Sequence, residues 1–463
     1  MYYQLIRSSV LSLFLLLAAS SSFGLSATAL QQGIPSLAPM LEEVIPAVVS
    51  IRVSKTIDGP SRFYFNDERI PEELRRYFNF GTPEDLPAPD QRQAVGSGSG
   101  VIVDARQGLI ITNHHVISDA DEITVTLNDA RSFSAELLGS DPGTDVALIK
   151  IQAEGLTALQ FADSDSVRIG DFVVAIGNPF GIGQTVTAGI VSALGRAGLN
   201  NENYEDYIQT DAAINLGNSG GALVDMEGRL VGINTAIISG NGGGSDGIGF
   251  AVPSNMVASV KTLLERDGEV RRGMLGVQIS DFTPALSRSL KLEHRNGALV
   301  TNVLSGSAAE AAGIELYDVI VAVNGEPIDS GRKLRNTIGL MGLDTPVKLQ
   351  LVRNGRDMQL TANLRSNDQV ADNRAEDARP VNRPDFNGAR LADNANGDGV
   401  RVVNVEPQSP ASFAGLRADD VILEVNREAV NDVASFNRHV DDSEGLVAVT
   451  VLRDNRRMML LMP

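Results

Sequence analysis

The sequence contains no cysteine. Disulfide bonds, thiolate nucleophiles and cysteine-ligated zinc sites are therefore excluded. Histidine is scarce too, because only His114, His115, His294 and His439 are present. This scarcity argues against a multi-histidine metal centre and narrows the search for a general base. We expect neither a metal nor a cofactor.

Basic residues are in the minority. Lys and Arg number 39 against 58 Asp and Glu, which gives a net charge of −19. A general nucleic-acid-binding protein needs a basic face to attract phosphates, so we expect no nucleic-acid partner. The phosphate-binding pattern G-x-x-x-x-G-K-[ST] is also missing, which predicts an activity independent of ATP.

Long apolar runs are missing as well. The run at 10–19 is about half the ~20 residues that span a bilayer. It follows Arg7 and precedes an A-x-A site at 27–29. This order is typical of a cleavable secretory signal, so we expect residues 1–29 to be removed and the mature chain to be exported without a stable membrane anchor. An uncleaved anchor is the alternative.

Residues 30–266 contain many short apolar stretches between Gly, Asn and Asp turns. Such spacing predicts an all-β sandwich or a pair of barrels. A helix is expected only at 254–266, where apolar residues follow helical spacing. The expected strands include 47–53, 100–103, 109–112, 122–127, 146–151, 171–177, 189–194 and 230–235.

The segment 55–94 departs from this pattern, since it is polar and rich in proline and aromatic residues. A connection this long is usually functional or disordered. Its aromatic residues favour docking onto another subunit, and a surface loop without a partner is the alternative.

The C-terminal part contains an internal repeat. Residues 297–303 (GALVTNV) match 399–405 (GVRVVNV), and the pair 318–320 and 420–422 reads D-V-I in both copies. We expect two homologous modules at 273–365 and 386–463. The polar, charged stretch 366–385 between them has linker composition.

Ser219 stands in the run Gly217-Asn218-Ser219-Gly220-Gly221. Flanking glycines permit a strained turn that exposes the hydroxyl and lets a substrate carbonyl approach. The same turn can aim two backbone N–H groups at one point and form an oxyanion hole. A plain hairpin turn is the alternative.

A hydroxyl nucleophile needs a base, and a histidine base needs an orienting acid. Only His114 and His115 lie in the β region, directly after the apolar stretch 109–112. Asp145 immediately precedes the apolar stretch 146–151, which can hold its carboxylate rigidly. Asp141 and Asp163 remain rivals, since most turn aspartates only cap or solvate.

Taken in order, the motifs T-N-H-H-V (112–116), T-D-V-A-L (144–148) and G-N-S-G-G (217–221) resemble the HtrA/Deg family of serine proteases. The resemblance implies a mainly β chymotrypsin-like fold with two packed six-stranded barrels. It implies that His115 is the base, Asp145 the acid and Ser219 the nucleophile. The backbone amides of Gly217, Asn218 and Ser219 would form the oxyanion hole.

The repeats resemble α+β PDZ domains. Residues Gly273, Met274, Leu275, Gly276 and Val277 look like a carboxylate-binding loop, whose N–H groups would clamp a peptide C-terminus. The corresponding 386–390 (FNGAR) departs from that pattern, so peptide capture by the second module is in doubt, and a packing or assembly role is the alternative.

The resemblance further implies a periplasmic protease for unfolded proteins that assembles into trimers and larger cages and also acts as a chaperone. A holdase chaperone with secondary proteolysis is one alternative. A peptide-binding scaffold with an inactive protease domain is another, although three retained catalytic residue types argue against it.

Specificity follows from the position six before Ser219, which is acidic in trypsin-like pockets and alanine here. We predict a small apolar pocket and cleavage after Val, Ala or Ile. A fluorogenic peptide panel tests this expectation, and preferred cleavage after Arg would contradict it. The expected pocket residues are Ala213, Ile214, Thr235, Ala236, Ile237 and Ile238.

Overall fold

The computed structural model describes residues 36–57, 92–179, 183–197, 204–215, 217–237, 247–293, 296–343, 345–365, 386–395, 399–443 and 445–462. The expected signal segment 1–29, the linker 366–385, His294 and most of the segment 55–94 lie outside these ranges. The chain divides into two compact units. The first contains most of residues 1–255, and the second contains 256–463 together with 138–146 and 195–207.

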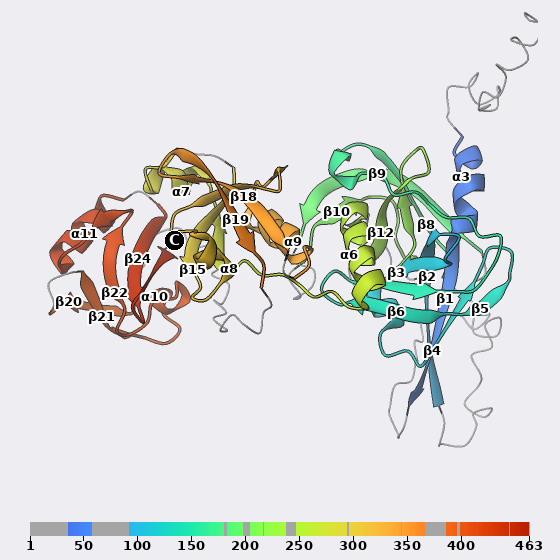
Figure 1. Cartoon of the computed structure of the whole chain (residues 1–463), viewed down its shortest axis with the longest axis horizontal. Coiled ribbons are helices and arrows are strands. Elements are labelled where there is room, and N and C mark those ends of the chain that lie inside the picture. Colours follow the sequence, from blue (N-terminus) through green and yellow to red (C-terminus); the bar gives the residue numbers. More distant parts are fainter. Residues whose placement is uncertain are drawn as a thin grey trace, which may run out of the picture. The chain divides into compact units, whose positions relative to one another are not determined.

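The first sheet has seven strands in the order β5-β4-β1-β2-β3-β7-β6 (Figure 1). Its edge strands β5 and β6 are separated only by Ala135, whose N–H donates to the Ile123 carbonyl. They therefore behave as one bent strand that closes the sheet, which agrees with the expected six-stranded barrel. The strands are β1 (Val48–Ile57), β2 (Arg92–Asp104), β3 (Leu109–Thr112), β4 (Glu122–Thr126), β5 (Ser132–Ser134), β6 (Glu136–Asp141) and β7 (Val146–Lys150).

Strands β1 and β2 are longer than their apolar residues predicted. They pair in register from Val48↔Val101 to Ile57↔Arg92. The antiparallel ladder joins backbone groups, so it continues through polar residues that apolar patterning does not mark. The ends of the segment 55–94 are therefore strand.

The second sheet is a closed six-stranded barrel in the order β10-β13-β12-β11-β8-β9. Its interior is filled by side chains such as Ile208, Leu223 and Ala251. The expected helix is present as α6 (Ser254–Asp267). The strands are β8 (Phe172–Gly177), β9 (Thr185–Arg196), β10 (Tyr207–Thr210), β11 (Ala222–Val224), β12 (Leu230–Ile237) and β13 (Gly249–Pro253). Short helices α3 (Ala38–Val44), η1 (Ile45–Ala47), α5 (His114–Ile117) and η2 (Ser164–Ser166) complete the protease region.

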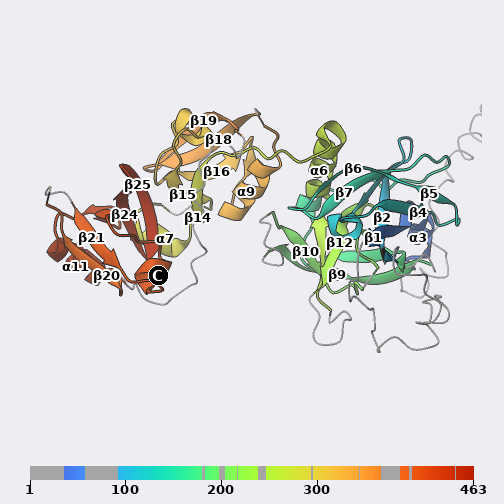
Figure 2. The ribbon, with the colours of Figure 1, turned by 90° about the horizontal axis from the view of Figure 1, so that it is seen from below.

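The internal repeat predicted from sequence corresponds to two sheets of the same topology. The first has the order β14-β15-β16-β18-β19 with β17 beside β16, and the second has β20-β21-β22-β24-β25 with β23 beside β22. Figure 2 shows the two copies in yellow to orange and in red. In each copy one face is covered by a longer helix, α9 (Gly331–Gly339) or α11 (Val433–Asp441), which begin 102 positions apart.

The remaining elements of the repeats follow the same order, except that helix α7 of the first copy has no counterpart among the described residues of the second. The first copy has β14 (Val277–Asp281), α7 (Pro284–Ser289), β15 (Ala298–Val303), α8 (Ala308–Ala312), β16 (Val319–Val323), β17 (Glu326–Pro327), β18 (Pro346–Arg353) and β19 (Arg356–Asn363). The second has β20 (Ala389–Asp393), β21 (Val400–Val405), α10 (Pro410–Phe413), β22 (Val421–Val425), β23 (Glu428–Ala429), β24 (Val447–Arg453) and β25 (Arg456–Met462).

A buried ion pair occurs at the same place in both copies. The Arg353 guanidinium donates to both oxygens of Asp318 at 2.7 Å, and Arg453 donates to both oxygens of Asp420 at 2.6 Å. The two aspartates are 0% and 1% exposed. Their carboxylates also accept the backbone N–H groups of Glu315 and Arg417. Each pair therefore ties the last residue of a strand to the turn before the central strand.

Removal of one partner of such a pair should be costly, because the other charge stays buried and unpaired. We predict that Arg353→Ala lowers the free energy of unfolding of the repeat unit by about 3 kcal/mol. Differential scanning calorimetry of the full chain measures the shift of the corresponding transition. Arg356→Ala, at the exposed start of β19, is the matched control. Equal melting temperatures for the two variants would contradict the prediction.

Candidate active site

The histidine pair lies where β3 ends. All four residues of this strand are buried, and Asn113 is the N-cap of the single-turn helix α5. Val116 and Ile117 point into the core of the first sheet, whereas His115 is exposed and His114 is half-buried. The buried pair holds the turn in place, so the His115 side chain is presented at the surface.

The Ser219 turn is held by its own backbone. The Asn218 N–H donates to the Asn215 carbonyl at 3.0 Å, and the Gly221 N–H donates to the Asn218 carbonyl at 2.9 Å. Gly217 has a φ of 94°, which favours glycine. A Cβ there would also lie 2.4 Å from the Pro179 Cβ, so only glycine fits at this position.

The histidine strand and the serine turn meet at β2. The Ser99 N–H donates to the Ser219 carbonyl at 2.8 Å, and the Thr112 hydroxyl donates to the Ser99 carbonyl at 2.7 Å. Gly98 provides the space for this approach. A Cβ at Gly98 would lie 2.7 Å from the Val116 Cγ1 and 3.2 Å from the Ser219 carbonyl oxygen. The residue after His115 and the predicted nucleophile therefore converge on one glycine.

Asp145 stands directly before β7, and Ala147 of that strand pairs with Thr112 at the end of β3. This register places the start of β7 beside the strand that leads to His115. Asp145 has a φ of 57°, a conformation that aspartate tolerates better than most residues. Burial, the Glu205 carboxylate and then the Asp145 carboxylate raise the pKa of Tyr207, so this phenol stays neutral at physiological pH.

Asp141, the first rival, is used inside the second unit. Its carboxylate accepts the Thr144 hydroxyl at 2.6 Å and the Arg272 guanidinium at 2.6 Å, and its side chain is 3% exposed. The same guanidinium lies 4.0 Å from the centre of the Tyr204 ring. These contacts give Asp141 a structural role.

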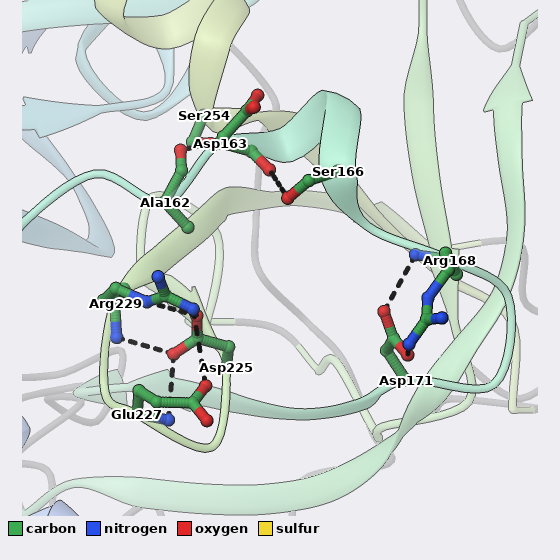
Figure 3. Close-up of polar contacts among 9 residues, drawn as sticks. All are labelled: Ala162, Asp163, Ser166, Arg168, Asp171, Asp225, Glu227, Arg229 and Ser254. Atoms are coloured by element: carbon green, nitrogen blue, oxygen red, sulfur yellow. Dashed lines mark hydrogen bonds and ion pairs between the residues drawn. The ribbon is translucent and has the colours of Figure 1, made fainter.

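Asp163, the second rival, is the N-cap of η2. Figure 3 shows it beside Ser166, whose hydroxyl donates to the Asp163 carbonyl at 2.7 Å. Its carboxylate accepts the Asp165 N–H at 3.1 Å and the Asn255 side-chain amide at 2.7 Å. Nearby, the Ser254 hydroxyl donates to the Ala162 carbonyl at 2.8 Å. Asp163 thus joins η2 to the start of α6.

The structure describes the side chains of three of the six expected pocket residues. Ile214 is 1% exposed and packs in the core of the closed barrel, so its side chain is committed to the interior. Ala213 is half-buried, and its carbonyl accepts the Thr187 hydroxyl at 2.8 Å. The Thr235 carbonyl accepts the Ser219 hydroxyl at 3.0 Å. The side chains of Ala236 and Ile237, and all of Ile238, lie outside the described residues.

The carboxylate-binding loop predicted in the first module and its counterpart in the second have similar backbones but different side chains. Gly276 and Gly388 have φ values of 78° and 89°, and their carbonyls accept the N–H groups of Leu304 and Glu406. Leu275, before the first glycine, is 4% exposed and packs in the module's core. The equivalent Asn387 is exposed.

In the second module, the residue before the exposed Asn387 is Phe386, which packs against a helix. Its ring packs edge-on against Phe436 of α11, with the ring centres 4.9 Å apart. The second loop therefore presents an aromatic residue to the helix that faces β20.

Sequence reasoning missed Ser99 and Thr112 as parts of the site. The signal available was the alternating run Gly96-Ser-Gly-Ser-Gly100 in β2. Small residues at alternate positions of a strand mark a close approach of another backbone. Within the described residues, no cluster of three or more acidic or histidine side chains could hold a metal ion. The same residues include no helix that is both long and apolar enough to cross a membrane.

Comparison with known families agrees with this architecture. Residues 98–233 match the family described as trypsin-like peptidase domain. Residues 273–364 and 384–460 each match the PDZ domain. The fold and the site thus define a trypsin-like serine peptidase followed by two PDZ domains.

Whole-chain relatives narrow this class. The periplasmic pH-dependent serine endoprotease DegQ of Escherichia coli K12 is 43% identical over 99% of both chains. The periplasmic serine endoprotease DegP of the same organism is 42% identical over 96% of this chain and 95% of its own. The solved HtrA-type protease AlgW with a decapeptide is 42% identical, covers 72% of this chain and 98% of its own, and has a TM-score of 0.54. The chain belongs to the HtrA/Deg family of serine endoproteases.

Proposed function

We propose that this endoprotease cleaves unfolded protein chains through Ser219 as nucleophile, His115 as general base and Asp145 as orienting acid. The observation that supports this proposal is the convergence of Val116 and the Ser219 carbonyl on Gly98. It brings the end of the histidine strand to the serine turn. The other aspartates considered, Asp141 and Asp163, are occupied by the structural contacts described above.

The reaction begins with a change of hydrogen-bond acceptor. The Ser219 hydroxyl donates to the Thr235 carbonyl, and it must donate to the His115 imidazole to be activated. As Ser219 Oγ attacks the peptide carbonyl, the imidazole takes its proton. The imidazolium, stabilised by Asp145, then protonates the leaving amine. Water, activated by the same imidazole, hydrolyses the acyl-enzyme and restores the free hydroxyl.

The negative charge that develops on the carbonyl oxygen needs hydrogen-bond donors. We assign the oxyanion hole to the backbone amides of Gly217 and Ser219. The third amide implied by the family resemblance, that of Asn218, donates to the Asn215 carbonyl instead. A small apolar pocket beside Ala213 would then favour cleavage after small aliphatic residues.

The first PDZ domain is proposed to capture peptide C-termini through residues 273–277, with the peptide added as a strand beside β14. The solved AlgW structures contain a decapeptide or a tripeptide, which supports peptide binding in proteins of this type. For the second domain we propose a packing or assembly role, because Phe386 and Asn387 replace the residues of the first loop.

Location and assembly are also proposals. The relatives DegQ and DegP are named periplasmic, which supports export of this chain by the segment 1–29 and action in the periplasm. Association into trimers and larger cages, and chaperone activity, follow from the family resemblance. A holdase in which proteolysis is secondary remains the alternative function.

Labelling with diisopropyl fluorophosphate tests the nucleophile. We expect peptide mass spectrometry to locate one adduct at Ser219 in the native protein and none after heat denaturation. Ser219→Ala should reduce casein hydrolysis to background, because no hydroxyl remains to form the acyl-enzyme. Labelling at another serine, or unchanged hydrolysis by this variant, would contradict the proposal. Suppression of aggregation by Ser219→Ala would separately establish chaperone activity.

A pair of isosteric variants tests the acid. Asp145→Asn should lower kcat by about 10⁴-fold, because an amide no longer holds the productive tautomer of His115 or stabilises its imidazolium. Asp163→Asn keeps an oxygen that can accept the Asp165 and Asn255 N–H groups, so kcat should stay within about twofold. Steady-state hydrolysis of a fluorogenic peptide measures both. A large loss in Asp163→Asn with little loss in Asp145→Asn would reverse the assignment.

A further inference from the structure

Ser99 in β2 makes hydrogen bonds with four separate positions of the chain. Its side chain is 0% exposed. The hydroxyl donates to the Gly217 carbonyl at 2.6 Å and accepts the Asn178 N–H at 2.8 Å. The backbone N–H donates to the Ser219 carbonyl, and the backbone carbonyl accepts the Thr112 hydroxyl. A hydroxyl has one proton to donate, and this proton is directed at Gly217.

The Ser99 hydroxyl orients the first peptide plane of the serine turn. A trans peptide is planar, so its C=O and N–H point in opposite directions. Ser99 holds the Gly217 carbonyl on one side of the turn. The N–H of that plane belongs to Asn218 and donates to the Asn215 carbonyl on the other side at 3.0 Å. The plane is thus held at both ends.

The Ser99 N–H orients another peptide plane of the serine turn, the one that contains the Ser219 carbonyl and the Gly220 N–H. It holds the Ser219 carbonyl at 2.8 Å, and the N–H of that plane, on Gly220, donates to the Asn234 carbonyl at 2.8 Å. Between these two lies the plane of Asn218 and Ser219. Its carbonyl accepts the Gly221 N–H at 2.9 Å, so the Ser219 N–H points the opposite way.

From this geometry we infer that Ser99 is a positioning residue for the oxyanion hole, an inference that rests on the proposed role of Ser219. Its hydroxyl holds the peptide plane that follows Gly217, and its N–H holds the plane that follows Ser219. These two planes flank the plane that carries the Ser219 N–H, and the first of them adjoins the Gly217 N–H across a single Cα. Ser99 therefore restricts the rotation of both proposed donors while charge develops on the substrate oxygen.

The Asn178 contact extends this control to the neighbouring segment. Asn178 follows β8 and precedes Pro179, which packs against the glycine-only position 217. The Ser99 hydroxyl therefore bridges Gly217 and the segment that packs on it. Loss of the hydroxyl would release both groups while leaving the Ser99 N–H and carbonyl in place.

Ser99→Ala tests the inference through a split between kcat and KM. We expect kcat to fall by about 10-fold to 100-fold, less than the loss of an entire donor, with KM changed by no more than about twofold. The inhibition constant of a substrate-like peptide aldehyde should rise by the same factor as kcat falls, because its hemiacetal oxygen occupies the hole. Ser50→Ala, at the buried residue opposite Ser99 in the pairing of β1 and β2, is the control and should keep wild-type kcat.

Two further variants preserve the test if Ser99→Ala does not fold. Ser99→Thr and Ser99→Val have nearly the same shape, and only threonine keeps a hydroxyl. We expect the threonine variant to have at least about tenfold higher kcat than the valine variant. Equal kcat for folded Ser99→Ala and Ser50→Ala, or for the threonine and valine variants, would overturn the inference. Failure of wild-type Ser219 to react with diisopropyl fluorophosphate would instead overturn the proposed function itself.

Discussion

The hydrogen bond from the Ser99 N–H to the Ser219 carbonyl joins the two sheets of the protease region where chemistry is proposed. A serine and a histidine on separate sheets can react together only if the two sheets keep a fixed relative position. Strand β2 provides a rigid anchor for this purpose, because it is paired with β1 on one side and β3 on the other, and Ser99 lies on it. The small residues around Ser99 follow from this constraint, since a larger side chain would separate the backbones.

Much of this arrangement could be predicted from the sequence. The G-N-S-G-G turn, the histidine pair after β3 and the aspartate before β7 carry local signals, because glycines and strand ends are visible in a linear pattern. Thr112 stands in the histidine motif, but its contact with Ser99 carried no local signal, and the other partners of Ser99, which are Asn178, Gly217 and Ser219, lie far away in the chain. Ile214 shows the opposite limit, because proximity to Ser219 in sequence indicated a pocket while its side chain turned into the barrel core.

Strand lengths show the same limit. Apolar patterning found the start of β1, the end of β2 and the middle of β9 but not the remaining parts of these strands, which the backbone ladders extend. The choice among three aspartates also needed tertiary contacts. Asp141 is identified as structural by Arg272, a residue 131 positions away in sequence, and no spacing rule contains that information.

The two PDZ domains show how far a repeat can diverge on one backbone. Both retain the glycine with positive φ, the buried Arg–Asp pair and the helix cap provided by the strand. Asp281 accepts the Gly331 N–H at 2.7 Å, and Asp393 accepts the Val433 N–H at 2.8 Å. The loops differ in side chains, since Leu275 is buried in the core of the first module and the equivalent Asn387 is exposed. The two modules thus share one scaffold and differ in the loop that is proposed to bind peptide in the first of them.

The division of the proposed catalytic residues between two sheets has a consequence for biosynthesis. A ribosome completes the histidine sheet at Lys150, 67 residues before Gly217 at the start of the serine turn, so every shorter translation product lacks the proposed nucleophile. Activity then requires the docking of two finished sheets. An incomplete chain of this kind therefore cannot cleave itself before its serine turn has been made.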